Sequence, residues 1–376
     1  MITAGSDRGR ATPRLGELAQ GRDNNLNLLR MAAAVAVLVS HAWPIALGDG
    51  AIQPMFRWTG MSLGSIAVQV FFVVSGFLIA ASFVRSDSLL RFTLARVLRL
   101  IPGLVVSIIL VGLVMGPFAS TLDPVAYLTH TETWGFLVRN ITLISVQYTL
   151  PGVFESNPYP TVEGSIWTLI HEVFCYVGVG IAGVCGILVR PRLATGCLIA
   201  AAFLWLTVFV GEVALPGRVL VFLELALPFG VGVTFWLWRD RIPLSAIASL
   251  VFWLIWALAF ATLGFTPLTQ MLFVFALAYA VFWVGYVPGG RWRLYNRLGD
   301  YSYGVYIYAF PMQGLAIWLF GSMSPLMNIL IALPLTLLPS ILSWHWIEKP
   351  ALVHGRALGL RLAGQEKRPR QSGAAS

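Results

Sequence analysis

Residues 64–84, GSIAVQVFFVVSGFLIAASFV, contain no charged side chain. An α-helix rises about 1.5 Å per residue, so roughly 20 apolar residues cross the hydrocarbon core of a bilayer. Lipid offers no hydrogen-bond partners to the backbone, and a single segment that crosses it therefore has to be a helix or a strand of a closed barrel. An uninterrupted apolar run of this length predicts a membrane-spanning helix.

Similar apolar runs recur along most of the chain. The 376 residues are 58% hydrophobic and only 11% charged, with a mean hydropathy of +0.79. An ordinary soluble domain carries about 25% charged residues. We therefore expect an all-α fold, a polytopic transmembrane bundle with about ten spans in a lipid bilayer. The expected spans are residues 26–47, 64–84, 97–117, 165–189, 193–210, 219–238, 243–262, 268–287, 299–320 and 325–347.

The basic residues lie mainly on one side of this expected bundle. All but four of the 25 lysines and arginines fall in the two tails and in every second connection. Lysine and arginine are enriched in cytoplasmic loops, so this pattern predicts that both termini are cytoplasmic. The same pattern accounts for the net charge of +9 without a nucleic-acid partner.

Three parts are expected along the chain. Residues 1–24 are a polar, basic cytoplasmic tail, 25–350 form the transmembrane domain, and 351–376 are a second cytoplasmic tail that we expect to be disordered. The long external segment 118–164 contains a moderately apolar stretch at 134–150 that either lies in the interface or re-enters the membrane. The three cysteines lie within or beside apolar spans, and we expect neither a disulfide nor a metal site.

Few spans carry ionisable side chains at membrane depth, where each costs several kcal/mol unless it is paired or hydrated. Arg30 and His41 are eleven residues apart in the first span, which places them on nearly the same helix face, about 16 Å apart in depth. Glu172 is expected about 10 Å below the outer surface, close to the depth of His41. His41 and Glu172 are therefore the candidate catalytic residues. The structural alternatives are a histidine bonded within the bundle and a glutamate that pairs with an arginine or histidine.

The span that contains Glu172 also carries a polar stripe. Ser165 precedes Glu172 by seven residues and Tyr176 follows it by four, so the three share one helix face. We expect this face to line a cavity, with Ser165, Trp167 and Tyr176 as candidate substrate-binding residues.

A second cluster is expected at the cytoplasmic ends of the spans. Arg96 and Arg99 are three residues apart and, with Arg30, form a cationic rim suited to phosphate oxygens. They are the candidate residues for binding a phosphorylated donor. The alternative is that these arginines are only positive-inside anchors.

Six short patches, in order, resemble one known family, the acyltransferase 3 group of integral membrane acyltransferases that includes O-antigen acetylases. The first patch is the arginine and histidine of the first span, separated by ten residues. The others are VQVFFVVSGFLI at 68–79, RVLRLIPG at 96–103, SIWTLIHEVFCY at 165–176, LGDYSYGVYIYAFP at 298–311 and WHWIEKP at 344–350. Together they cover most of the chain from Asn25 to Pro350.

The resemblance implies an O-acetyltransferase-like enzyme of the plasma (inner) membrane. Its donor would be acetyl-CoA or another acyl-CoA, and its acceptor a hydroxyl of a cell-surface or exported carbohydrate or glycolipid. It also implies that His41 is essential, that Arg30 acts with it, and that Arg96, Arg99 and Glu172 are important. Many relatives carry a histidine where this chain has Ala309, so no role of that histidine can be transferred.

Two mechanisms and two functions remain open from the sequence. His41 can act as a general base toward the acceptor hydroxyl, or it can accept the acyl group covalently and pass it on. Polar residues at membrane depth also mark transport pathways, so a transporter or flippase of a glycolipid or acyl-bearing substrate is the alternative function. The acceptor sugar, the acyl chain and the oligomeric state are not fixed by the sequence.

Overall fold

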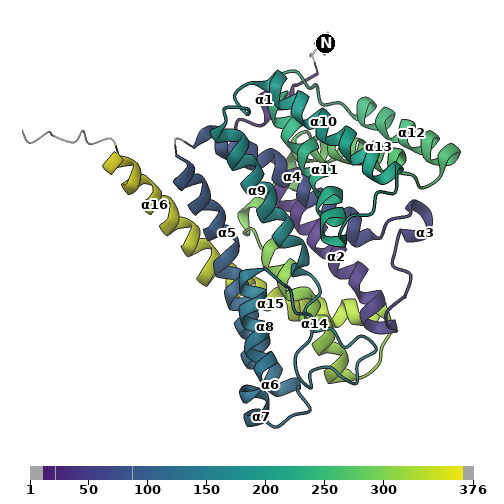
Figure 1. Ribbon diagram of the computed structural model, residues 1–376, viewed down its shortest axis with the longest axis vertical. Helices are drawn as coiled ribbons and strands as arrows, with labels where there is room; N and C mark the ends of the chain where they lie inside the picture. The colour runs from purple at the N-terminus through teal and green to yellow at the C-terminus, as the bar shows by residue number, and fades with distance from the viewer. Residues whose placement is uncertain (1–11, 22, 87, 367–376) are drawn as a thin grey trace, which may run out of the picture. The chain divides into compact units, whose positions relative to one another are not determined.

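The computed structural model describes residues 12–21, 23–86 and 88–366, with side chains described as far as residue 359 (Figure 1). These residues form helices joined by loops and contain no β-strand, only two isolated bridges. The predicted all-α fold is therefore confirmed. The parts of the two expected tails at residues 1–11 and 367–376, together with Arg22 and Asp87, lie outside the described residues.

Within the described chain, nine helical segments are long and apolar enough to cross a bilayer. Their positions agree with nine of the ten expected spans, which confirms a polytopic helical membrane protein. They are Leu26–Leu47 (α2), Leu63–Arg85 (α4), Leu89–Ala119 (α5, η1 and α6), Ile166–Val184 (η2 and α9), Pro191–Val210 (α10), Gly217–Leu237 (α11), Ala246–Leu263 (α12), Pro267–Tyr286 (α13) and Pro325–Gly359 (α15, η4 and most of α16).

The remaining expected span, residues 299–320, is a helix as well, α14 (Ser302–Phe320), but it is less apolar than the nine. Three tyrosines and Gln313 lower its hydropathy. Most of its residues are buried, so α14 is surrounded by protein along most of its length. A helix with this composition packs through its tyrosines and small residues instead of presenting an apolar face to lipid.

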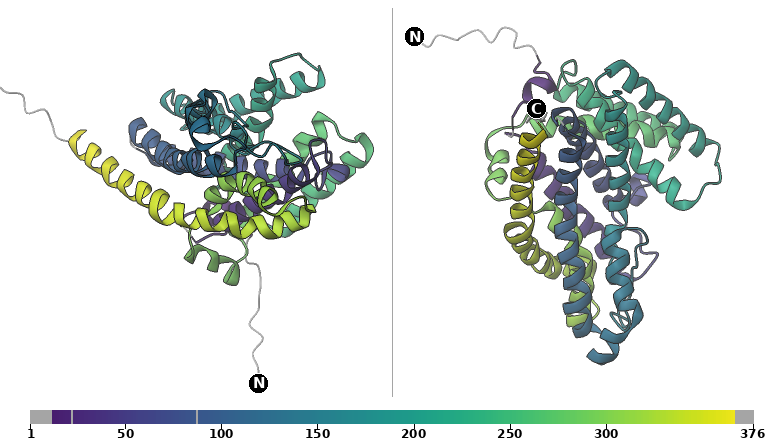
Figure 2. Two further views of the ribbon diagram at one scale, coloured as in Figure 1. Left: turned by 90° about the horizontal axis from the view of Figure 1, so that it is seen from below. Right: turned by 60° about the vertical axis from the view of Figure 1, so that its left-hand side comes forward.

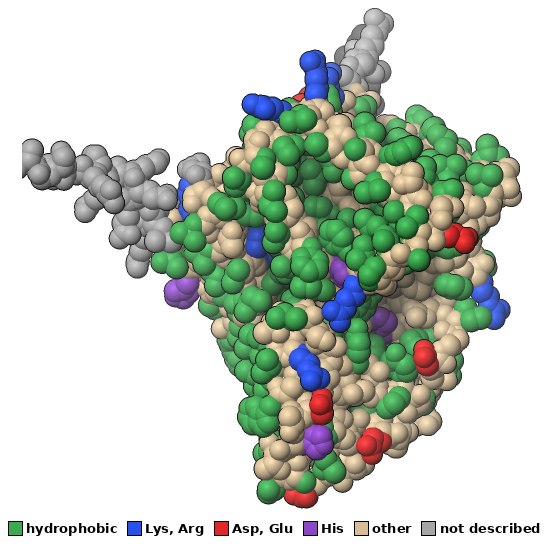
Figure 3. Space-filling model, in the orientation of Figure 1, with side chains coloured by type: hydrophobic (Ala, Val, Ile, Leu, Met, Phe, Trp, Pro, Cys, Tyr) green, Lys and Arg blue, Asp and Glu red, His purple; other side chains and the backbone are tan. Residues whose placement is uncertain are grey.

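The chain divides into two compact units. Unit 1 contains the described residues up to Leu29, then Gln69–Leu78 and Arg190–Leu298; unit 2 contains Arg30–Val68, Ile79–Val189 and the chain from Gly299 onward. In unit 1, α13 packs against α10, α11 and α12 (Figure 1). Only 6% of the α12 segment is buried, which suits a helix that faces lipid. Hydrophobic side chains likewise cover much of the face shown in Figure 3.

Part of the expected N-terminal tail is folded onto unit 1. The short helix α1 (Leu15–Leu18) is held by the backbone N–H of Leu15, which donates to the carbonyl of Ile242 over 2.9 Å. The Leu15 side chain is fully buried. This apolar residue anchors a segment that its composition alone would leave in solvent.

In unit 2, α5 (Leu89–Ile109) begins eight residues before the expected start of the third span, so Arg96 and Arg99 lie inside this helix. At the other end of the chain, α15 (Pro325–Ser343) passes through a π-helical turn into α16 (Lys349–Glu366). Residues 351–366, expected to be disordered, are therefore helical. Figure 2 shows α16 beside α5, where Gly355 lies against Leu98. This packing stabilises the extra helical turns.

The external segment also folds within unit 2. Residues 134–142 of the ambiguous apolar stretch belong to α8 (Thr131–Thr142), which packs against α5 and η1 (Leu110–Met115), and residues 143–150 form a loop. The preceding helix α7 (Pro124–Thr129) is fixed by the buried Tyr127, whose hydroxyl donates to the carbonyl of Gly112 over 2.7 Å. Burial raises the pKa of Tyr127 to about 12, so this phenol stays a hydrogen-bond donor.

Candidate functional site

The first part of the site is an ion cluster centred on Asp300, just before α14. One carboxylate oxygen of Asp300 accepts hydrogen bonds from Arg30 of α2 and Arg99 of α5, each over 2.6 Å. The other oxygen accepts the hydroxyl of Ser302. Only 14% of the Asp300 side chain is exposed, although its position suggested an interfacial residue. Asp300 thus joins three helices that are far apart in the sequence.

Arg99 also binds a second carboxylate. Its guanidinium donates to Glu348 over 3.1 Å, and the hydroxyl of Ser343 donates to the other oxygen of Glu348. The Glu348 side chain is 2% exposed, and the ring of Tyr303 lies 5.5 Å from the Arg99 guanidinium carbon. A glutamate directly after an apolar span was the available sequence signal for this residue.

The predicted cationic rim is therefore largely neutralised by carboxylates that sequence reasoning did not assign to it. Arg30 and Arg99 form ion pairs, whereas Arg96 makes no ion pair or hydrogen bond to a residue that the structure describes, and its buried Nε lacks a partner there. Arg96 instead lines a largely apolar cavity of about 560 Å³ formed by α5 and α9 (Leu169–Val184). Its guanidinium remains available to an anionic ligand.

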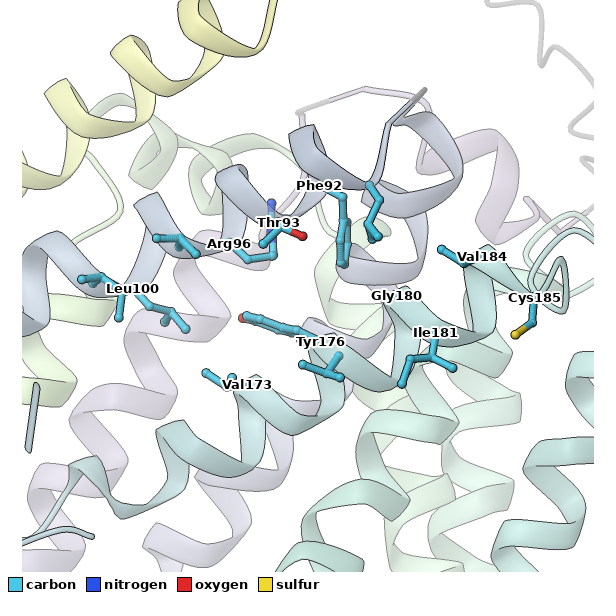
Figure 4. A pocket seen from close by; sticks show the side chains of 14 residues that line it. Phe92, Thr93, Arg96, Leu100, Val173, Tyr176, Gly180, Ile181, Val184 and Cys185 are labelled. Carbon is cyan, nitrogen blue, oxygen red and sulfur yellow. The ribbon is translucent and has the colours of Figure 1, made fainter. Parts of the chain in front are cut away.

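Tyr176 and Glu172 also belong to this end of the site. Figure 4 shows Tyr176 reaching from α9 toward α5, where Arg96 and Leu100 line the cavity. The Tyr176 hydroxyl donates to Glu172, and Glu172 is close enough to Arg96 to interact with it electrostatically. The polar stripe on α9 therefore meets the arginines of α5.

His41 lies elsewhere in unit 2, against α14. Its imidazole packs edge-on against the ring of Phe310, with 5.2 Å between the ring centroids. The Nδ1 atom is buried and has no hydrogen-bond partner in the described part of the chain. The structure does not show a hydrogen bond from His41 to Glu172 among the described residues, so the proposed pairing of these two residues remains untested.

The chain that leads into α9 contacts the same phenylalanine. A Cβ atom added to Gly164 would lie 2.3 Å from a carbon of the Phe310 ring, so the glycine backbone packs directly on the ring. On α14, the hydroxyl of Tyr306 donates to the carbonyl of Ser165 over 2.7 Å. These contacts place the backbone at Gly164 beside the ring that also packs against His41, with Glu163 and Ser165 as the adjacent residues.

Glu163 is completely buried and lies before the membrane-spanning segment. One carboxyl oxygen accepts the backbone N–H of Ser165 over 3.1 Å, while Oε2 has no described partner. Burial raises the pKa of Glu163 to about 8, although backbone N–H groups of residues 164–166 lower it. Sequence analysis did not select Glu163; its place two residues before an expected span was the only available signal.

The remaining predicted binding residue, Trp167, lies in the 3₁₀ turn Ile166–Thr168 (η2). Its ring is 6.1 Å from that of His171, a buried residue that also packs against Phe174. The structure thus brings Ser165 to the Phe310 ring and Tyr176 to the arginines. No group of His, Cys, Asp and Glu side chains among the described residues could hold a metal ion.

Comparisons with known proteins match nearly the whole chain. A family model described as an acyltransferase domain (Acyl_transf_3) covers residues 23–345. An O-acetyl transferase of Shigella phage Sf6 is 29% identical over 343 residues, which cover 87% of this chain and 96% of that protein. Nodulation protein 10 of Rhizobium leguminosarum bv. viciae is 28% identical over 371 residues, which cover 89% of this chain and 95% of that protein. No solved structure matches. The chain therefore belongs to the acyltransferase 3 family and is a multi-pass membrane acyltransferase.

Proposed function

We propose that the protein transfers an acetyl or related acyl group from a cytoplasmic acyl-CoA to a hydroxyl of a cell-surface or exported carbohydrate. The plasma (inner) membrane would be its location. The observation that carries this proposal is the arrangement along α14. Asp300, just before α14, binds the arginines, while Phe310, within the helix, packs against His41. One helix thus connects an anion-binding end with a histidine about 15 Å away in depth.

The arginine end is the proposed donor site. Coenzyme A is anionic, and Arg96 has a guanidinium without an ion pair among the described residues, beside a cavity of about 560 Å³. In this proposal Arg96 binds a donor phosphate directly. Arg30 and Arg99, already bonded to carboxylates, position that site. Glu172 and Tyr176 lie at the same end, and in this proposal Tyr176 contacts the donor.

The His41 end is the proposed site of chemistry. In this proposal the imidazole of His41 takes a proton from the acceptor hydroxyl and returns it to the leaving thiolate. The buried, unpartnered Nδ1 of His41 supports a role in binding or proton transfer. Covalent acylation of His41 is the competing route and would give ping-pong kinetics. Ser165 and Trp167 would contact the substrate beside it.

Label transfer tests this function directly. Membranes that contain the protein are incubated with radiolabelled acetyl coenzyme A, and label is followed into base-labile esters of glycolipid or polysaccharide. We expect wild-type protein to transfer label and His41→Ala to lose at least about 100-fold of the rate, since a general base contributes typically that much. His354→Ala, at an exposed histidine of α16, is the matched control and should behave as wild type.

Two outcomes would contradict the proposal. Equal labelling by His41→Ala at matched abundance would remove His41 from the chemistry. Wild-type membranes that label no carbohydrate, with acetyl-CoA or with longer acyl-CoA donors, would contradict acyl transfer from acyl-CoA to carbohydrate and point to a different acceptor or donor.

A further inference from the structure

We propose that Glu163 and Ser165 form the site that binds the carbonyl oxygen of the donor thioester beside His41 and stabilises the oxyanion formed there. The inference rests on the proposed acyl transfer. It adds a catalytic residue, Glu163, that the sequence pattern did not identify.

The first support is location. Gly164 packs directly on the Phe310 ring, and the imidazole of His41 packs on the same ring, 5.2 Å between centroids. Tyr306 fixes the backbone here by its hydrogen bond to the Ser165 carbonyl, 2.7 Å long. Glu163 and Ser165 flank Gly164, so their side chains start within one residue of a ring that His41 also contacts.

The second support is the set of polar atoms without partners. Glu163 and Ser165 are both 0% exposed, and within the described chain neither the Oε2 atom of Glu163 nor the Oγ atom of Ser165 has a hydrogen-bond partner. His41 Nδ1 is in the same condition. A buried polar atom without a partner is destabilising unless a ligand supplies one. Two such atoms belong to the neighbours of Gly164 and the third to His41, and both Gly164 and His41 contact the Phe310 ring, which points to a site for a polar ligand group.

The third support is the protonation of Glu163. A folded-state pKa of about 8 means that the carboxyl keeps its proton at neutral pH and can donate a hydrogen bond through Oε2. The titratable groups nearby are His41 on α2, Tyr306 on α14, Tyr159 and Tyr148 in the loop, and Glu172 on α9, which interacts electrostatically with Tyr306 as Glu163 does. Among the described residues, no charged side chain contributes to this shift, so burial dominates.

The chemical step uses these groups as follows. The acceptor oxygen attacks the thioester carbon and forms a C–O bond, while His41 takes the hydroxyl proton and the carbonyl π pair moves onto oxygen. Glu163 and Ser165 donate hydrogen bonds to that oxyanion, where preorganised donors are most effective. The carbonyl then re-forms, the C–S bond breaks, and the thiolate of coenzyme A takes the proton from His41.

The pH dependence of kcat in three variants tests the site. Wild-type kcat should fall as pH rises through about 8, because Glu163 loses the proton that it donates. Glu163→Ala should lower kcat about 100-fold or more at pH 7, the usual loss for one oxyanion donor. Glu163→Gln keeps an N–H donor that does not titrate. It should retain activity within about tenfold of wild type and lack the alkaline decline.

Controls separate this proposal from the function on which it rests. Active wild-type membranes establish the acyl transfer before any variant is judged. Glu155→Gln, at an exposed glutamate of the same loop, should keep the wild-type profile, and Ser165→Ala removes the second donor if Glu163→Ala does not fold. The rate of thioester hydrolysis measured in His41→Ala membranes is subtracted from every rate as background.

Three results would overturn the assignment while leaving the enzyme's function intact. One is a Glu163→Gln variant as inactive as Glu163→Ala, which would mean that an ionised carboxylate is required. The second is an alkaline decline that persists in Glu163→Gln. The third is an unchanged kcat in both Glu163→Ala and Ser165→Ala.

Discussion

At the residue scale, Arg99 illustrates how charge is kept inside unit 2. Its side chain is 13% exposed and binds Asp300 and Glu348, so one guanidinium serves two carboxylates. Each carboxylate also accepts a serine hydroxyl. Taking a charge out of water costs several kcal/mol, and this cost is offset only when the charge is both paired and hydrogen-bonded.

Asp300→Asn should therefore destabilise the protein strongly. The amide keeps the shape but removes the negative charge that neutralises Arg30 and Arg99, and we expect the free energy of unfolding to fall by about 2–4 kcal/mol. Reversible unfolding in mixed detergent micelles measures this change. The matched control is Glu132→Gln, in an ion pair with Arg139 whose side chains are 50% and 49% exposed. That variant should lose less than about 1 kcal/mol. Equal losses in the two variants would show that burial of the Asp300 cluster adds nothing.

At this scale, sequence analysis identified one residue of each contact but not its partner. Arg30, Arg99 and His41 are unusual in apolar spans and were selected for that reason. Their partners Asp300 and Phe310 lie more than 200 residues away along the chain, and no periodic pattern links positions at that separation. Glu172 was expected near His41 from an estimate of depth, but the contacts of α9 place it with Tyr176 and Arg96.

At the element scale, the segment before α9 packs closely on α14 because the contacting residue, Gly164, has no side chain. Gly164→Ala would place its Cβ within 2.8 Å of three atoms of the buried Phe310 ring. Overpacking of this kind costs typically about 1–3 kcal/mol, and we expect the melting temperature in detergent to fall. Gly178→Ala is the control in α9, since its Cβ would meet nothing within 4 Å and alanine is the better helix former.

Partial recovery in the double variant Gly164→Ala/Phe310→Leu would confirm that the ring is the obstacle. A Gly164→Ala protein as stable as Gly178→Ala would mean that Phe310 moves aside freely. Such mobility would weaken the packing argument for the Glu163 site.

Helix positions were the most predictable feature of the elements, because composition and length determine what can cross a bilayer. Span 193–210 was expected and Pro191–Val210 is observed. The predicted start of the third span was wrong, because the helix begins eight residues earlier. Arg91, Arg96 and Arg99 lower the hydropathy of this segment, although its charges are partly paired within the protein. The π-helical turns before α6 and α16 have no sequence signal of this kind.

At the scale of the whole molecule, α14 decides on which side of the membrane the chain ends. Nine crossings leave the termini on opposite sides, whereas ten leave them on the same side. α14 runs beside α2, because Arg30 binds Asp300 and, eleven residues later, His41 packs on Phe310. A helix that accompanies a membrane-spanning neighbour over this length shares its depth. We therefore predict that α14 also crosses the membrane, which gives ten crossings in all, and that both termini are cytoplasmic.

Cysteine labelling tests this topology. The three native cysteines, Cys175, Cys185 and Cys197, are first replaced. Single cysteines are then placed at exposed positions: Ser322→Cys follows α14 and His354→Cys follows α15. Asp49→Cys and Asp240→Cys mark two reference loops. An impermeant maleimide applied to right-side-out vesicles should label Ser322→Cys and Asp49→Cys. His354→Cys and Asp240→Cys should react only after permeabilisation, as the basic loops require. If α14 did not cross, the α15–α16 segment would cross in the opposite direction. His354→Cys would then label from outside and Ser322→Cys would be protected.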